Sequence, residues 1–279
     1  MPCVWCRGLL LAVLFGTASP TFAQPVWVAT ERTGGFHAEY LRPDIEGSSA
    51  ASGAVYLGVR APVGSHVALV GELPLAHGDF DLGNVDLKAN TTLGNPYVGV
   101  ELGPRHSSVH FEIGARLPVL KEVDAASSVG FLADPVDRPE AFLEDLLAVS
   151  AVAHYRRFGP GGFGWMLHGG ATAWLTAEES DRDAPVGTAP PDDEIVAHYG
   201  ARFGWRGRTG GFLAGVTGRA NVSDPNGSFG DRALTQIAGA GYLRLGPVRP
   251  GLEFRLPLDD DLREIVDGTI GVSLVIAAP

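Results

Sequence analysis

The sequence predicts an all-β chain, folded as an antiparallel up-and-down transmembrane β-barrel of about twelve strands with a short helix in the third long loop. Three observations favour this fold. Segments of alternating apolar and polar residues fill most of the chain, and the connections between them alternate between long and short. After Gln24 no apolar run is long enough for a transmembrane helix, so a chain that enters a membrane must cross it as a barrel.

The strands are predicted from a two-residue alternation between turn signals, because successive side chains of a strand point to opposite faces. In one segment, for example, Phe111 and Ile113 share one face while Glu112 and Arg116 share the other. The twelve predicted strands are Gly34–Leu41, Ala54–Arg60, His66–Leu73, Pro96–Leu102, Val109–Leu117, Leu147–Phe158, Phe163–Thr176, Ile195–Arg206, Phe212–Val222, Leu234–Leu245, Val248–Leu256 and Ile265–Ile276.

The connections decide between a membrane barrel and a soluble β-sandwich. In a transmembrane barrel short turns lie on the periplasmic side and long loops lie outside, and an even strand count brings both termini to the periplasm. A sandwich has equivalent loops at its two ends and does not predict such alternation. The short, mostly Gly- and Pro-containing turns are 61–65, 103–108, 159–162, 207–210 and 246–247, and the longer connections are 42–53, 74–95, 118–146, 177–194, 223–233 and 257–264.

The third long connection contains a helix signal. Asp137 precedes Pro139, as an N-cap precedes a first-turn proline, and the apolar residues of 142–147 follow at helical spacing. We predict a short helix that ends near Leu147. A helix that continued to His154 would reduce the strand count to eleven and put the termini on opposite sides.

Residues 1–23 have the pattern of a secretory signal peptide. The apolar centre, Leu9–Phe15, is too short to cross a bilayer and is followed by a small-x-small cleavage site that ends at Ala23. We expect a single barrel domain over residues 24–279. Both cysteines lie in the removed segment, outside a lipoprotein context, so the mature chain is expected to have neither a disulfide nor a lipid anchor.

Several features together resemble a known class. They are the signal peptide, the alternating loops, recurring strand ends such as Leu73-Pro74-Leu75 and Leu117-Pro118-Val119, and the segment Gly94–Gly99. With these the chain resembles small-to-medium bacterial outer-membrane β-barrel proteins of a poorly characterised, transporter- or porin-like class. The resemblance covers nearly all of the mature chain and implies residence in the outer membrane, in contact with its lipid. The C-terminus departs from the class, because it ends in Pro279 where such barrels commonly end in an aromatic residue.

Charge is unevenly distributed along the chain. The long connections, with Asp267 beside the last, hold 26 of the 32 acidic residues but only seven Lys and Arg, whereas the rest of the mature chain holds 13 Arg. We predict an acidic outer rim, which either keeps exposed loops soluble or recruits divalent or cationic solutes. Acidic stretches such as Asp259–Asp261 lack the ligand spacing of a calcium loop. An acidic rim also argues against nucleic-acid binding.

The polar faces of the strands supply the candidate lumen residues. These residues either fill the lumen with ion pairs or line a narrow channel, and the sequence leaves both interpretations open. In a channel the arginine excess predicts anion preference at the constriction, against the field of the acidic mouth. The candidates are His37, Glu39, Arg60, Glu72, His110, Glu112, Arg116, His154, Arg156, His168, His198, Arg202, Arg219, Arg244, Glu253 and Arg255.

The sequence offers no catalytic, metal or cofactor site. The Gly-x-Ser-x-Gly pattern and the Gly-x-x-His-x-Ser-Asn-Gly pattern of outer-membrane phospholipases are absent, and the histidines are scattered rather than clustered as metal ligands are. We therefore expect a monomeric narrow channel or binding barrel for a small solute or ion. The alternatives are a non-conducting structural or interaction barrel that acts through its acidic loops, and an outer-membrane hydrolase.

Overall fold

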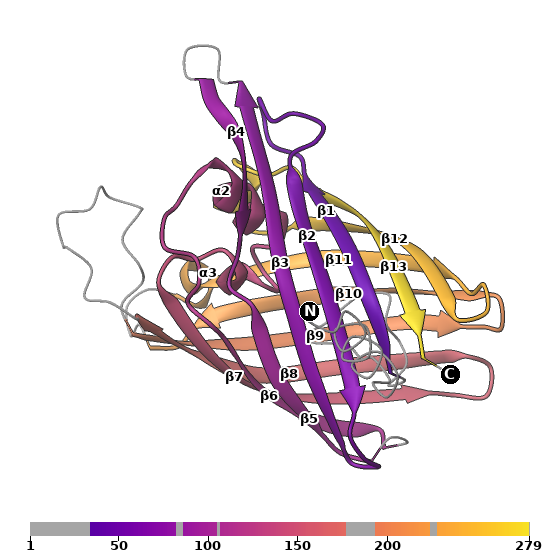
Figure 1. The fold of residues 1–279 in the computed structure, drawn as a ribbon. Helices are drawn as coiled ribbons and strands as arrows, with labels where there is room; N and C mark the ends of the chain where they lie inside the picture. The colour runs from indigo at the N-terminus through magenta and orange to yellow at the C-terminus, as the bar shows by residue number, and fades with distance from the viewer. Residues whose placement is uncertain (1–33, 82–85, 105–106, 177–192, 224–227, 279) are drawn as a thin grey trace, which may run out of the picture.

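The computed structural model describes residues 34–81, 86–104, 107–176, 193–223 and 228–278. Within them twelve strands close an antiparallel barrel, as predicted, and one further strand extends beyond it (Figure 1). The predicted signal peptide, residues 1–23, lies outside the described residues. No helix in the described ranges is long and apolar enough to cross a membrane.

The barrel strands pair with their neighbours along the chain, except that β3 pairs with β5 because β4 (Asp86–Leu93), between them in the sequence, lies outside the barrel. They are β1 (Gly35–Pro43), β2 (Gly53–Pro62), β3 (Val67–Asp81), β5 (Tyr97–Leu102), β6 (Val109–Arg116), β7 (Leu146–Phe158), β8 (Phe163–Thr176), β9 (Glu194–Arg206), β10 (Gly210–Asn221), β11 (Ala233–Leu243), β12 (Val248–Pro257) and β13 (Thr269–Ala277).

The barrel closes between its first and last strands. Gly35 pairs with Ala277 and Pro43 pairs with Thr269, so β1 and β13 are in register along their whole length. Both ends of the barrel therefore lie together on the side of the short turns, as an even strand count requires. The segment for which a longer helix was the alternative is strand β7 throughout, so the predicted count of twelve is confirmed.

The wall separates an apolar outer surface from a polar inner one. Side chains of β13 alternate without exception between buried and exposed, and Ile270 on the outside is 67% exposed. On β6 the exposed side chains include Phe111 and Ile113, and the buried ones include Glu112 and Arg116, as the alternation predicts. An exposed apolar band around a closed barrel is the surface that lipid covers in this fold.

Strand β4 (Asp86–Leu93) was missed, because its range fell inside a predicted long loop. It pairs with the upper part of β3, which runs past the predicted end at Leu73 to Asp81, and Figure 1 shows this hairpin rising beyond the barrel. A strand outside the membrane needs no apolar face for lipid. The run Asn90-Thr91-Thr92 is polar throughout, so it lacks the alternation by which the barrel strands were predicted. The last strand also begins later than predicted, at Thr269 instead of Ile265.

A short helix in the third long loop is confirmed, but it lies earlier than predicted. Helix α2 (Ala125–Ala133) begins at the N-cap Asp124, whose carboxylate and backbone exchange hydrogen bonds with Ser127. After Asp137 the chain forms only the 3-10 turn η1 (Pro139–Ala141). It then passes through Asp145, whose backbone is left-handed with φ 46°, and enters β7 at Leu146. Two further short helices, α3 (Phe229–Arg232) and α4 (Asp260–Arg263), lie in later long loops.

Candidate functional site

The third long loop, residues 118–145 and called the inserted loop below, folds into the barrel. Its apolar side chains pack on inward-facing side chains of β1, β2 and β3, where the ring of Phe142 meets the edge of Tyr56 with centroids 6.1 Å apart. This cluster fixes the loop to one side of the lumen, and α2 lies beside β3 and β4 at the long-loop end (Figure 1). The buried cluster consists of Leu41, Ala54, Tyr56, Ala76, Leu120, Ala126, Ala133, Ala141 and Phe142.

Arg138 is the centre of an ion-pair network between the inserted loop and the wall. Its guanidinium donates from Nη2 to Glu39 Oε2 at 2.5 Å and from Nη1 to Glu72 Oε2 at 3.1 Å. Within the loop it donates from Nε to Asp134 Oδ2 at 2.5 Å, and it lies 3.7 Å from the centroid of the Tyr56 ring. All of these side chains are buried. The planar fork of donors allows one guanidinium to satisfy three carboxylates away from water.

Arg255 on β12 binds the same carboxylates from another part of the wall. It forms an ion pair with Asp134 and donates from Nη2 to Glu39 Oε1 at 3.1 Å. Burial by itself would raise the pKa of Asp134, but the guanidiniums of Arg255 and Arg138 outweigh it and lower the pKa. Asp134 is therefore ionised while the loop is inserted.

A second bridge runs from η1 to β8 and β10. Glu140 forms an ion pair with Arg219, and the indole N–H of Trp174 donates to the same carboxylate at 3.0 Å. Burial alone would raise the pKa of Glu140, but attraction to Arg219 outweighs it and lowers the pKa to about 2. On β11 the side-chain amide of Gln236 donates to Asp137 at 3.1 Å.

Asn95, between β4 and β5, fastens both ends of the inserted loop. Its side-chain oxygen accepts the backbone N–H groups of Val119 and Leu120, each at 2.9 Å. Its amide nitrogen donates to the carbonyls of Glu140 at 3.0 Å and Leu143 at 2.6 Å. All four hydrogen bonds that an amide side chain can make are thus made to the backbone of the loop.

The structure brings some of the predicted lumen residues together and leaves others apart. Glu39, Glu72 and Arg255 meet at the Arg138 network, which Arg116 joins through Glu72 at 2.6 Å. Arg60 pairs instead with Glu101 at 2.5 Å, and Arg244 lies just beyond the short-turn end of β11. The buried candidates are His37, Glu39, Arg60, Glu72, Glu112, Arg116, Arg202, Arg219, Glu253 and Arg255, and the half-buried ones are His110, His154, Arg156, His168, His198 and Arg244.

The prediction of an acidic outer rim is wrong for three of the acidic residues of the inserted loop. Asp134, Asp137 and Glu140 are buried in the lumen, where Asp134 pairs with Arg255 and Glu140 pairs with Arg219. Among the described residues the buried ionisable side chains comprise eight carboxyl groups and seven guanidiniums, so acidic and basic groups are nearly equal in number. Ion pairs therefore join the inserted loop to the wall at the level of Arg138.

Sequence reasoning missed Asn95, Asp134, Arg138 and Glu140 as site residues. The available signal was the charge of the third long loop, which is opposite to that of the strands. The interruption at Gly94-Asn95-Pro96 was a second signal, because it separates two strands that share one edge of β3. Neither signal predicts that the loop turns into the barrel. Its direction depends on the side chains of the wall, which are known only once the strands have been placed in space.

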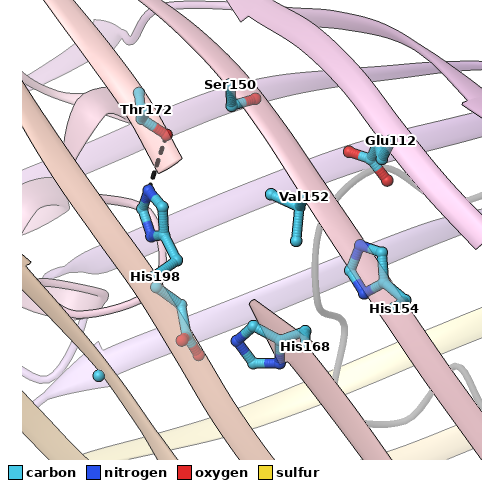
Figure 2. A pocket seen from close by; sticks show the side chains of 9 residues that line it. Glu112, Ser150, Val152, His154, His168, Thr172 and His198 are labelled. Atoms are coloured by element: carbon cyan, nitrogen blue, oxygen red, sulfur yellow. Dashed lines mark hydrogen bonds between the residues drawn. The ribbon is translucent and has the colours of Figure 1, made fainter. Parts of the chain in front are cut away.

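A pocket lies between the inserted loop and the wall formed by β6 to β10. In Figure 2 His154, His168 and His198 border one space, and the hydroxyl of Thr172 hydrogen-bonds to His198 Nε2 at 2.7 Å. His110 stacks on His154 with centroids 4.6 Å apart. No group of three or more His, Cys, Asp or Glu side chains in the described ranges is arranged to hold a metal ion. The pocket is lined by Glu112, Asp137, Ser150, Val152, His154, His168, Thr172, His198 and Gly218.

The fold is that of bacterial outer-membrane β-barrels. Among solved structures the chain is similar to a NanC porin, with 7% identity, a TM-score of 0.53, and 87% of this chain and 100% of that chain covered. It is also similar to LpxR from Salmonella typhimurium, with 9% identity, a TM-score of 0.51, and again 87% and 100% of the two chains covered. No protein-family model and no curated protein matches the sequence. At these identities the likeness concerns the fold alone, so the function must be argued from the lumen.

Proposed function

We propose that this chain is an outer-membrane channel for small solutes that its own inserted loop holds closed. The observation that carries the proposal is that the loop bridges opposite walls. Arg138 pairs with Glu72 on β3, and Glu140 pairs with Arg219 on β10, six strands away around the ring of twelve. A loop attached to both walls blocks the lumen between them, and a loop released from one wall leaves a polar passage.

The chemistry of the attachment favours a movable closure over a permanent filling. Burying an ion pair costs desolvation of both charges, and well-packed apolar side chains fill an interior at least as stably. Here the wall facing the loop is charged, as Glu39, Arg219 and Arg255 show. When the loop leaves, water can hydrate these side chains, whereas an apolar interior would collapse or stay dry.

We infer that the barrel resides as a monomer in the outer membrane, in contact with its lipid, after removal of residues 1–23. N-terminal sequencing of the membrane-extracted protein is expected to begin at Gln24. We propose no catalytic role. His198 shares a hydrogen bond with Thr172, but among the described residues no carboxylate hydrogen-bonds to that imidazole, and nucleophilic catalysis needs such a third group.

Conductance in planar bilayers tests the proposal. We expect the refolded wild type to open rarely and the Arg138→Met variant to open often, because Glu39 and Glu72 each lose one of their two buried arginine partners. The control is Arg263→Met, since Arg263 is exposed and 3.9 Å from its partner Asp260.

Heat-modifiable gel mobility shows which of these variants fold. A folded, inserted Arg138→Met barrel without conductance would overturn the channel and leave a non-conducting barrel that acts through its loops.

A further inference from the structure

We propose that solutes pass the inserted loop through the pocket on the β6–β10 wall, and that this pocket selects small, uncharged, hydroxyl-bearing solutes. The inference rests on the proposed function and adds to it the route and the class of solute. Three observations support it: the asymmetric attachment of the loop, the hydrogen-bonding groups of the pocket, and the opposite charges around it.

The loop is attached differently on its two sides. Toward β1, β2 and β3 it is fixed by the buried apolar cluster, and beside β5 it is fixed by the four hydrogen bonds of Asn95. Toward β8 and β10 it is held by Glu140, through Arg219 and Trp174. Loss of the Glu140 contact therefore frees the loop from β8 and β10, while its contacts to β1, β2 and β3 and to Gln236 and Arg255 remain. The passage that opens lies where the pocket already separates the loop from the wall.

The pocket is lined with groups that both donate and accept hydrogen bonds. The lining includes three imidazoles, which at neutral pH ordinarily present one donor and one acceptor each, and the hydroxyls of Ser150 and Thr172. Among the described residues that line it, Val152 is the one large apolar side chain. A hydroxyl-bearing solute can replace water at each of these groups, because a hydroxyl also donates and accepts and leaves no polar atom unpaired.

The charges around the pocket disfavour ions of either sign. Glu112 and Asp137 line it and repel anions. Arg219 is the direct cross-strand partner of His198, and Arg202 is paired across from Met166, two residues before His168. These guanidiniums repel cations. An uncharged solute avoids both penalties, so we expect it to pass faster than an ion of similar size.

Swelling of proteoliposomes tests the class of solute. The Glu140→Gln variant provides a barrel in which the β8 and β10 attachment is weakened and the rest of the loop is anchored. Erythritol, erythronate and putrescine serve as uncharged, anionic and cationic probes of comparable length. We expect erythritol to enter fastest. Faster entry of erythronate or putrescine would overturn the assignment of class.

Cysteine modification tests the route in the same variant, refolded without residues 1–23 and therefore without Cys3 and Cys6. Ser150→Cys places a thiol in the pocket, and Ala76→Cys places one in the apolar cluster on the other side of the loop. We expect a neutral methanethiosulfonate reagent to modify the folded Ser150→Cys barrel and slow erythritol entry, and to leave Ala76→Cys unmodified until the barrel unfolds. The reverse pattern would overturn the route.

The failure of the route and the failure of the channel are distinguishable. If erythritol enters neither the Glu140→Gln barrel nor the Arg138→Met barrel, although both are folded and inserted, the proposed function is overturned and this inference with it. If erythritol enters both but modification of Ser150→Cys changes nothing, the channel stands and the route through the pocket is wrong.

Discussion

The side-chain oxygen of Asn95 accepts the backbone N–H of Leu120 at 2.9 Å, where the inserted loop enters the barrel. The amide of the same side chain donates to the carbonyl of Leu143 at 2.6 Å, where the loop leaves. One residue of the wall thus closes the base of the loop. Asn95 lies where β4, outside the barrel, gives way to β5 within it, so the break between these strands positions the fastening residue.

We expect Asn95→Ala to loosen the inserted loop. The substitution removes the partners of four backbone groups, and each buried polar group left without a partner costs about 1–3 kcal/mol. The expected results are faster proteolysis within residues 118–145 and more frequent channel openings. Asn95→Asp keeps the acceptor for Val119 and Leu120 but loses the donor, so an intermediate effect is expected. If the loop of the folded Asn95→Ala barrel resists proteolysis as well as the wild-type loop does, Asn95 does not fasten it.

Closure is expected to weaken in acid. The pKa of Glu140 is lowered from 4.5 to about 2 while the loop is inserted, because Arg219 attracts its carboxylate. A lowered pKa means that this stabilisation is fully present above about pH 4.5 and is lost as the pH falls toward 2. Open probability in bilayers should therefore rise over that range.

Glu140→Gln is the matched control for this pH dependence, because it keeps the shape of the side chain and removes the charge. It should open more often at neutral pH, and its openings should depend less on pH between 4.5 and 2. An equally steep pH dependence in this variant would assign the effect to another group.

The alternation of single strands made the barrel predictable, whereas the inserted loop depends on pairing between distant residues. Phe111 and Glu112 are predicted to lie on opposite faces of the wall because they are adjacent in the sequence, and successive side chains of a strand point to opposite sides. Arg138 reveals nothing of this kind, because its partner Glu39 is 99 residues away and local sequence does not report such a contact. The sequence shows that the third loop is acidic. It does not show that the loop folds inward, because that requires knowing where the arginines of the wall lie.

The packing of α2 on Phe142 is expected to tolerate no added side chain at Gly130. A Cβ built there would lie 2.6 Å from the Phe142 ring, so Gly130→Val must push the helix from the ring. Overpacking of this kind typically costs about 1–3 kcal/mol. The expected result is a lower midpoint for heat-induced loss of the compact gel form. Gly64→Val is the control, because a Cβ at Gly64 in a short turn meets open space. Equal midpoints for the two variants would show that the helix adapts.

Ion selectivity of the open channel is expected to be weak and slightly anionic. Among the described residues the buried side chains of the wall itself comprise six guanidiniums and five carboxylates. The exposed rim contributes little at high salt, since the Debye length falls to about 3 Å at 1 M. Reversal potentials of the Glu140→Gln barrel in a KCl gradient measure this balance.

Two substitutions separate the lumen from the rim as the source of that selectivity. Glu72→Gln removes a buried wall carboxylate and should increase anion preference, whereas Asp260→Asn, at a side chain that is 98% exposed, should leave the reversal potential unchanged. The acidic loops would set selectivity if Asp260→Asn shifted the potential and Glu72→Gln did not. That result would contradict a lumen-controlled channel, because only charges close to the narrowest part of the path escape screening by salt.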